Sequence, residues 1–476
     1  METRNIFKNI SPLDHRYYLS NRQIFERLSD YLSEEAGIRY CIKVEIALLD
    51  TLISFFEDKL GSYRSQLQKI EENITCIEIY KEEEKIHHNI RALVNVLKKS
   101  VPEPLRPYVH LGATSADIMD TAASMRLKGV VRNVIIPLLL DLLEAMVLIT
   151  EKEANSFQAG RTHGQHAVPI TFGFAMAEYV SRLGKSISLI EELSSELRGK
   201  LSGAVGAFNA TSLIVSDPVK LEEKFLFSLG LKPSEHSTQI VEPEYFLRVL
   251  LEINVAFGII ANLADDLRHL QRSEIGEVRE SFSEKQVGSS TMPQKRNPWN
   301  SEHVKSMWKA FSPRVISFFM DQISEHQRDL TNSASLRFIA DYLAGFTEAV
   351  ARMKQVVTHL VVDHDRLKEN LKKSGDLLFA EPAYILLSAS GDSNAHERIR
   401  RFTLECESKK KPLLELIQKD RELWNIITAQ LKKTTGMSSS EFFETPENYA
   451  GKAKEIALII AEKYKGEIKR IRKAIG

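Results

Sequence analysis

Long stretches without helix breakers constrain this chain more than any other feature. From Phe246 to Leu270 apolar side chains occupy nearly every face of a helix, with only a few charges between them. A helix of about 25 residues is about 37 Å long. Similar stretches run over Phe172 to about Lys200, Glu302 to Met320 and Leu336 to Val362. The sequence therefore predicts an all-α fold built around an elongated central bundle of long helices.

The pattern changes on both sides of this central region. The first hundred residues are mixed and helical, whereas shorter amphipathic helices follow Asp363, ending in a basic helix over Lys452 to Arg472 that we expect at the surface. These changes predict three parts, an N-terminal helical domain (1–108), the central long-helix bundle (109–362) and a C-terminal helical domain (363–476). The bundle would hold the subunit contacts and most active-site loops. Its all-round apolar helices exceed what one small bundle covers, which predicts a homo-oligomer.

Charge and cysteine content exclude several classes of protein. Lys plus Arg and Asp plus Glu are each 64, so the formal net charge is zero, which argues against a nucleic-acid or membrane-surface binder. The most apolar stretch, Val130 to Thr150, is interrupted by charges, and the N-terminus resembles no export signal. Cys41, Cys76 and Cys406 lie far apart, in no disulfide or thiolate-metal spacing. We therefore expect a cytoplasmic protein.

Polar breaks between the long helices carry the densest functional groups. They are HLGATSAD (110–117), AGRTHGQHAVP (159–169), SGAVGAFNATS (202–212) and VGSSTMPQKRNP (287–298). The last combines a Gly-Ser-Ser start, backbone donors and two cations, a composition suited to closing over an anionic substrate. Composition alone leaves an exposed linker as the alternative.

This last segment resembles the GSSxMPxKxNP motif of the fumarase, aspartase and argininosuccinate lyase superfamily. Further segments resemble its adenylosuccinate lyase branch, namely SPLDHRY (11–17), HLGATSADIMDTA (110–122), GRTHGQHAVPITFG (160–173), QRDLTNSASLR (327–337), AEPAYILL (380–387) and PENYAGKA (446–453). The resemblance spans nearly the whole chain. It implies a cofactor-free, metal-free enzyme, and the sequence offers no Rossmann-type glycine motif or metal-ligand cluster.

The resemblance also implies a reaction. Adenylosuccinate lyases release fumarate by anti β-elimination from adenylosuccinate, giving AMP, and from succinylaminoimidazole carboxamide ribotide (SAICAR), giving AICAR, in purine biosynthesis. A base removes a proton next to a carboxylate, donors stabilise the resulting aci-carboxylate, and an acid protonates the leaving nitrogen. By motif position Ser289 is the base and His163 the acid. Ser290 joins the substrate-binding groups, although a one-residue slip would exchange the two serines. Lys295 and Asn297 bind the succinyl carboxylate.

Two positions, Asn89 and His15, depart from the family pattern. His88, flanked by His87 and Asn89, matches a histidine that contacts the nucleotide phosphate and supports the acid. The family commonly has Asp where this chain has Asn89, which removes a negative charge and predicts a lower pH optimum if that charge raises a histidine pKa. His15 stands where the family often has glycine, and it precedes the nucleotide-contacting pair Arg16 and Tyr17.

The other matches complete a pocket for a nucleotide and two carboxylates. Thr114 and Ser115 correspond to hydroxyls near the substrate carboxylate, and Gln239 corresponds to a further polar contact. Arg328, Ser333 and Arg337 correspond to a phosphate and ribose cluster. In the superfamily such regions converge when bundles pack, so the resemblance implies a homotetramer whose active sites each draw on three chains. Arginine suits phosphate geometry, but a surface ion pair is the commoner role of a single arginine.

Two alternatives stay open at this stage. Gln294 is typical of argininosuccinate lyases, but a substrate without phosphate would not require SPLDHRY or the Arg328, Ser333 and Arg337 cluster. A non-catalytic protein that keeps the fold is the other, and the presence of both His163 and Ser289 argues against it.

Overall fold

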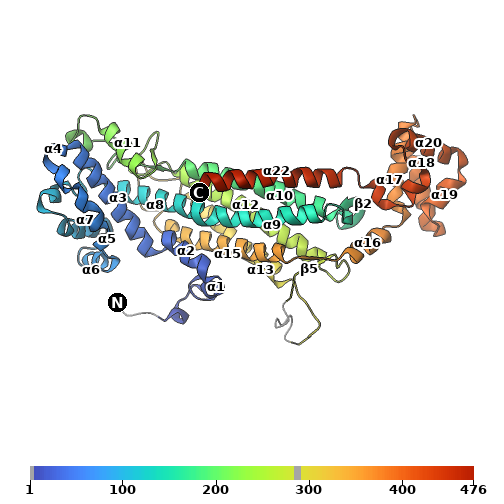
Figure 1. The fold of residues 1–476 in the computed structure, drawn as a ribbon, viewed down its shortest axis with the longest axis horizontal. Helices are drawn as coiled ribbons and strands as arrows, with labels where there is room; N and C mark the ends of the chain where they lie inside the picture. Colours follow the sequence, from blue (N-terminus) through green and yellow to red (C-terminus); the bar gives the residue numbers. More distant parts are fainter. Residues whose placement is uncertain (1–4, 283–290) are drawn as a thin grey trace.

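The computed structural model describes residues 5–282 and 291–476 and has an elongated shape (Figure 1). Long helices run along its middle, N-terminal helices gather at one end and C-terminal helices at the other. The predicted all-α fold with a central long-helix bundle is confirmed. The division at residues 108 and 362 stays a prediction.

The residues from Ile42 to Val109 enclose a hydrophobic cluster that also takes in residues of α8 and α11, whereas Leu28 belongs to the central cluster. Several helices make up this N-terminal part. They are α1 (Arg16–Ser20), α2 (Arg22–Leu32), α3 (Glu34–Phe55), α4 (Glu57–Leu60), α5 (Leu67–Asn73), α6 (Cys76–Ile86) and α7 (Asn89–Ser100). Ser33 caps α3 by accepting the Ala36 N–H, and Thr75 and Glu78 form a capping box on α6.

The central helices, apart from the one over Pro218–Ser228, share the largest hydrophobic cluster. They are α8 (Ser115–Val130), α9 (Ile136–Lys152), α10 (Phe172–Ser195), α11 (Pro218–Ser228), α12 (Pro243–Leu270), α13 (Trp299–Phe311), α14 (Val315–Met320) and α15 (Ile339–Thr358). A π-helical turn over Val131–Ile135 joins α8 to α9, just before Pro137. The single helix predicted over Glu302 to Met320 is wrong, because Pro313 lies in a 3-10 turn that separates α13 from α14.

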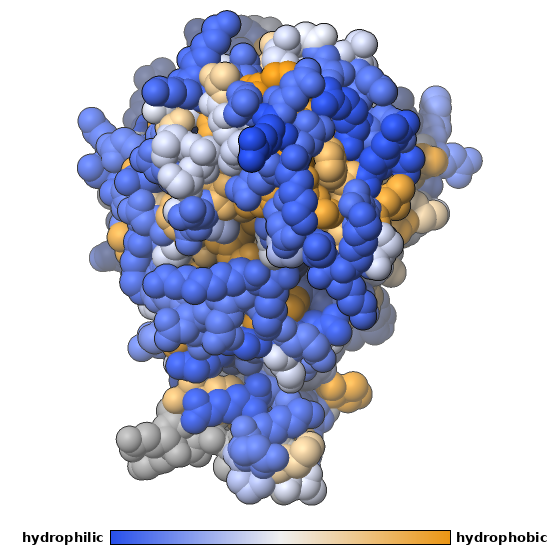
Figure 2. Space-filling view, turned by 90° about the vertical axis from the view of Figure 1, so that its right-hand side faces the viewer, coloured by the Kyte–Doolittle hydropathy of each residue, from blue (hydrophilic) through white to orange (hydrophobic). Residues whose placement is uncertain are grey.

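At the far end the C-terminal helices form a third cluster, except for the first and the last, whose Leu367 and Tyr464 belong to the central cluster. They are α16 (His364–Lys373), α17 (Ala380–Ala389), α18 (Ala395–Lys409), α19 (Leu413–Lys419), α20 (Arg421–Thr435), α21 (Ser439–Phe443) and α22 (Ala453–Ile475). Figure 2 looks onto this end, where hydrophilic residues cover most of the surface between hydrophobic patches. Helix α22 leaves this end and runs back along the bundle (Figure 1).

Short strands and single 3-10 turns complete the chain. The strands β1 (Phe157–Thr162) and β2 (Gln165–Thr171) form an antiparallel hairpin, β3 (Arg198–Gly199) pairs in parallel with β4 (Lys232–Pro233), and β5 (Val278–Arg279) pairs antiparallel with β6 (Val361–Val362). The 3-10 turns are Ile6–Lys8, Pro12–Asp14, Gly61–Gln66, Glu103–Tyr108, Thr211–Leu213, Ser312–Arg314, Ser335–Phe338, Asp376–Phe379 and Pro446–Tyr449. The segment 159–169 is therefore largely a hairpin, where the sequence predicts an irregular break.

Helix α22 is exposed on one side and buried on the other. One of its faces contributes Ala461, Tyr464, Ile468 and Ile471 to the central cluster, although it lies in the third predicted part of the chain. The Tyr464 hydroxyl donates to the Ser181 carbonyl at 3.0 Å. The prediction of an exposed basic helix therefore holds for its charged face alone.

Packing between α22 and α10 depends on the missing side chain of Gly184, because a Cβ there would lie 2.1 Å from the buried Tyr464 ring. We expect Gly184→Ala to lower the free energy of unfolding by about 1–3 kcal/mol through overpacking. Gly466 lies on α22, and a Cβ at this residue would meet no atom within 4 Å. Gly466→Ala is therefore the matched control and should raise the free energy of unfolding by about 0.4–1 kcal/mol. Thermal unfolding of both variants checks the opposite signs, and equal shifts would contradict this packing.

Two helical stretches, Ser115–Lys152 and Pro243–Leu270, are long and apolar enough to cross a membrane, judged by length and composition alone. In each, more than half of the most apolar window is buried inside the chain, at 61% and 56%. Other large apolar side chains of the central helices are exposed, among them Leu148, Val255, Ile316, Phe319 and Met320.

Candidate active site

His163 occupies the tip of the β1–β2 hairpin. The turn has two residues, His163 and Gly164, with φ of 53° and 73°. Two-residue hairpin turns favour positive φ at both positions because their twist then matches the strands, and Gly164 adopts this conformation without steric cost. The His163 side chain is exposed. The hairpin therefore presents an imidazole to solvent at a defined point.

A buried carboxylate holds the first strand of this hairpin in place. Arg161 donates to both oxygens of Glu277, at 3.0 and 2.6 Å. Gln158 Nε2 and Asn370 Nδ2 also donate to this carboxylate, at 2.7 and 2.8 Å. Bidentate arginine–carboxylate pairs restrict geometry as well as position. The strand before His163 is thereby tied to β5 and α16.

His166 lies three residues beyond His163, and its Nδ1 is 2.8 Å from the Ser374 hydroxyl. Burial and the nearby Arg161 charge lower the pKa of His166, so the neutral ring is favoured. The contact with Ser374 gives His166 a structural role at the junction with the C-terminal helices.

Thr114 and Ser115 lie at the start of α8. The Thr114 N–H donates to Asp117 Oδ2 at 2.8 Å, which caps the first turn. Four residues earlier His110 has a left-handed backbone with φ 62°, and its Nδ1 is 2.6 Å from buried Glu45. Sequence reasoning missed His110 as a residue held near these hydroxyls, although it begins the HLGATSAD segment.

Gln239 lies in a loop that packs against α8. The Val241 N–H donates to Asp120 Oδ2 at 3.0 Å. Arg328 also acts on Asp120, because its positive charge lowers the pKa of that carboxyl. The structure therefore brings Gln239 and Arg328 to the helix that carries Thr114 and Ser115.

The Asp120 carboxyl makes the stability of this region depend on pH. Burial raises its pKa from 3.8 to about 6, against the opposing effects of the Val241 N–H and Arg328. Because the folded pKa lies above the unfolded one, this group stabilises the fold fully below about pH 4 and less as pH rises through 6. Asp120→Asn should therefore gain roughly 2 kcal/mol over the wild type between pH 4 and pH 8. Thermal unfolding across this range checks the gain, and a constant difference would contradict it.

The motif at 287–298 is described from residue 291 onward, so Ser289 and Ser290 lie outside the described residues. Lys295 is exposed, and its N–H donates to the Met292 carbonyl at 3.0 Å, closing a turn before Asn297. The neighbouring Arg296 carbonyl accepts from Gln271 Nε2 at 3.2 Å.

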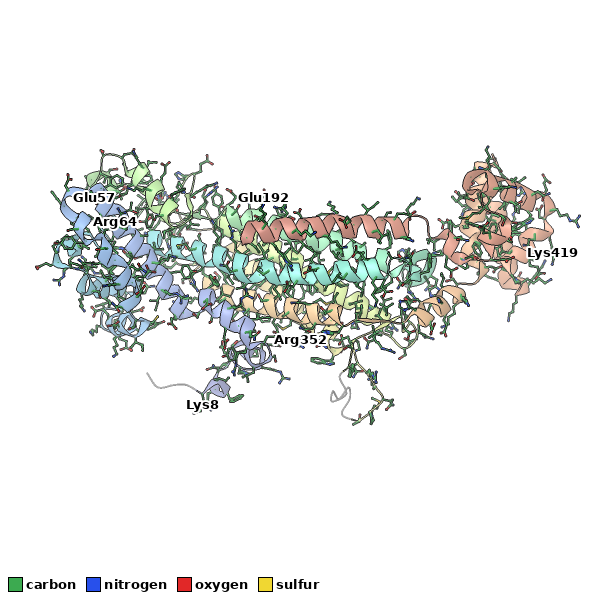
Figure 3. All side chains as sticks on the ribbon, viewed as in Figure 1. Lys8, Glu57, Arg64, Glu192, Arg352 and Lys419 are labelled. Atoms are coloured by element: carbon green, nitrogen blue, oxygen red, sulfur yellow. The ribbon has the colours of Figure 1, made fainter. Side chains whose placement is uncertain are left out.

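Buried Glu280 holds the start of α13 that follows this motif. It accepts the N–H groups of Asn300 and Ser301 at 3.3 and 2.8 Å, and both of their side chains at 2.9 and 2.7 Å. Arg352 on α15, labelled in Figure 3, donates to the Asn300 side-chain oxygen at 3.0 Å. Its guanidinium group also lies over the Trp299 ring. The segment with Lys295 and Asn297 therefore ends at a fixed point.

Tyr17 reaches α13 as well. Its hydroxyl is 3.2 Å from Nε2 of His303. Burial and the charges of Arg352 and Arg16 lower the pKa of His303 and favour its neutral form. Sequence reasoning missed His303, which nothing but its position after the motif distinguishes.

The remaining predicted residues are exposed in the single chain. His87 ends α6 with a left-handed φ of 55°, and His88 caps α7 by accepting the Arg91 N–H on Nδ1 at 3.2 Å. Asn89 is the first residue of α7. Ser333 and Arg337 lie in the exposed segment before α15.

The predicted residues thus fall into separate groups along one chain. Figure 1 places α8 and β2 toward opposite ends of the bundle, and α6 lies beyond α8. One group contains Thr114, Ser115, Gln239 and Arg328. His163 forms a second, and the motif residues with Arg16 and Tyr17 lie around α13. Within residues 5–282 and 291–476, no group of three or more His, Cys, Asp or Glu side chains is placed to hold a metal ion.

Adenylosuccinate lyases are similar to this chain over nearly its whole length. Adenylosuccinate lyase from Pyrococcus abyssi is 32% identical, covering 94% of this chain and 96% of its own length. The Pyrococcus horikoshii adenylosuccinate lyase is 31% identical, covering 97% and 99%. Among solved structures, 3-carboxy-cis,cis-muconate lactonizing enzyme from Pseudomonas putida superposes with a TM-score of 0.76 at 22% identity, over 97% of this chain and all of that one. That likeness shows the fold alone.

Two family profiles cover most of the chain. The lyase family matches residues 37–310, and the family described as adenylosuccinate lyase C-terminal matches residues 324–438. The first contains the hairpin, the start of α8 and the motif, and the second begins just before Arg328. The chain therefore belongs to the adenylosuccinate lyase family.

Proposed function

We propose that the protein is a carbon–nitrogen lyase that releases fumarate from adenylosuccinate, giving AMP, and from SAICAR, giving AICAR. The observation that carries this proposal is the similarity to adenylosuccinate lyases, at 32% identity over 94% of the chain in the Pyrococcus abyssi relative. The exposed imidazole of His163 on a fixed hairpin supports it.

The residues divide the elimination into two proton transfers. Ser289 removes the proton from the carbon next to a succinyl carboxylate. The electron pair of the broken C–H bond moves into that carboxylate, which becomes an aci-carboxylate. Lys295, Asn297 and the hydroxyls of Thr114 and Ser115 donate to the added negative charge. The electron pair then returns to form the fumarate double bond, the C–N bond breaks, and His163 protonates the departing nitrogen. Histidine suits this step because both of its forms exist near neutral pH.

The nucleotide part of the substrate requires the other groups. Arg16, Tyr17 and His87, His88 and Asn89 bind the phosphate side, and Arg328, Ser333 and Arg337 the phosphate and ribose. Asn89 hydrogen-bonds without charge, in place of the family aspartate. Exposed Arg337 and half-buried Arg328 leave guanidinium groups available for phosphate.

Separation of these groups supports a homotetramer with active sites shared between three subunits. Exposed apolar side chains on α9, α12 and α14, such as Leu148, Val255 and Phe319, support the same assembly because large apolar patches favour association. The protein acts in the cytoplasm.

A chromatographic fumarate assay on the purified protein tests the function, with adenylosuccinate and argininosuccinate offered in parallel and Ser289→Ala as control. We expect fumarate and AMP from adenylosuccinate only. Product from argininosuccinate instead would mean that Gln294 marks the substrate class. If the folded protein released fumarate from neither substrate, the result would contradict the proposal and favour a non-catalytic role.

A further inference from the structure

Asp117 and Lys200 form an ion pair whose side chains are both fully buried. Asp117 lies in the first turn of α8, three residues after Thr114, and Lys200 follows β3. The free-energy cost of removing two charges from water can exceed their mutual attraction, and apolar residues of similar volume often stabilise a fold equally well. The backbone segments that the ion pair holds together therefore indicate a role for it other than stabilising the fold.

The pair joins two backbone segments at one point. Asp117 Oδ1 accepts the N–H groups of Ser202 and Gly203 at 3.2 and 3.3 Å, while Oδ2 accepts that of Thr114. Lys200 Nζ donates to the Gly203 carbonyl at 3.1 Å. The start of α8 and the 200–206 loop are thus fixed to each other through this single carboxylate.

The 200–206 loop in turn contacts the loop that carries Gln239 and restricts its position. The hydroxyls of Ser202 and Ser237 are 2.7 Å apart and buried. Gly206 has a φ of 80°, and a Cβ at that residue would lie 1.9 Å from the Ser237 carbonyl oxygen. This close approach requires glycine, so the two loops are in direct backbone contact two residues before Gln239.

We infer that the buried Asp117–Lys200 ion pair is a positioning pair that holds Thr114, Ser115 and Gln239 in one arrangement for the succinyl part of the substrate. The inference rests on the proposed function. Neither Asp117 nor Lys200 touches the substrate, since both side chains are enclosed. They act through backbone groups, setting the spacing between two hydroxyls on α8 and an amide on a separate loop.

Steady-state kinetics distinguishes this role from a purely structural one. Contacts made to the substrate before and during reaction raise KM when misplaced and leave kcat nearly unchanged, whereas a loss of folded protein lowers kcat at constant KM. We expect Lys200→Met to raise KM for adenylosuccinate by about tenfold or more. Lys128→Met is the matched control, because Lys128 lies on the helix that carries Asp117 and, like Lys200, donates to a glycine carbonyl, that of Gly230, at 2.7 Å.

A second variant tests the relay without leaving a buried charge unpaired. Ser202→Ala removes only the hydroxyl that contacts Ser237, and we expect KM to rise about fivefold with kcat within about twofold. Ser186→Ala, which removes a buried hydroxyl bonded to Glu252 at 2.5 Å in the bundle, is its control and should leave both constants unchanged.

Each outcome decides one question. A raised KM in Lys200→Met and Ser202→Ala, with normal values in both controls, supports the inference. If Ser202→Ala keeps its KM, or if kcat alone falls together with the thermal midpoint, the positioning role is overturned while the proposed function stands. An inactive wild-type protein overturns the proposed function, and the positioning role with it.

Discussion

We expect His163→Asn to lower kcat for adenylosuccinate by roughly 100- to 10,000-fold, the range that a general acid contributes. The structure favours asparagine over alanine for this test. His163 has a left-handed backbone with φ 53°, a region where asparagine is one of the better tolerated residues and alanine is strained. The side chain is exposed, so its loss opens no cavity. The variant therefore removes the imidazole and keeps the hairpin.

His166→Asn is the matched control for this measurement. The residue belongs to the same hairpin, also carries an imidazole, and contacts Ser374 instead of pointing from the tip. We expect kcat within about threefold of the wild type, because only a group that transfers a proton in the transition state costs more. Steady-state kinetics and circular dichroism of both variants check the difference. Near-normal turnover by His163→Asn would remove the residue from the acid role.

The sequence predicts the long helices well because their signal is local. Few breakers and all-round apolar faces indicate α10, α12 and α15 within a few residues of their observed ends. Pro313 was a local signal too, and applying the rule that proline ends a helix would have separated α13 from α14. The hairpin was harder to foresee, because Pro169 lies inside β2 and argues against a strand there.

Contacts between distant residues account for what the sequence leaves open. Glu277 meets Arg161 across 116 positions, and Lys200 meets Asp117 across 83. Helix and strand periodicities relate residues only a few positions apart, so only the folded structure identifies these two pairs. Arg161 and Asp117 lie inside the segments that contain His163 and Thr114, but their partners Glu277 and Lys200 lie outside any pattern read along the chain.

Ser289→Ala should cause the second large loss, again roughly 100- to 10,000-fold in kcat, because the proton next to the carboxylate then has no base. Its KM should change little, since the donors that bind the carboxylate remain. Binding of adenylosuccinate to the inactive variant, measured by calorimetry, checks this second point. A variant that no longer binds the substrate would make Ser289 a binding residue.

The neighbouring Ser290→Ala is the sharpest control, because the two serines are adjacent and chemically identical. If motif position assigns the base correctly, Ser290→Ala raises KM and retains most of kcat, as expected for a hydroxyl that contacts the substrate in both the ground and transition states. The reverse pattern, in which Ser290→Ala loses turnover and Ser289→Ala loses affinity, would shift the base by one residue. Both patterns keep His163 as the acid, so the pair of variants tests the base alone.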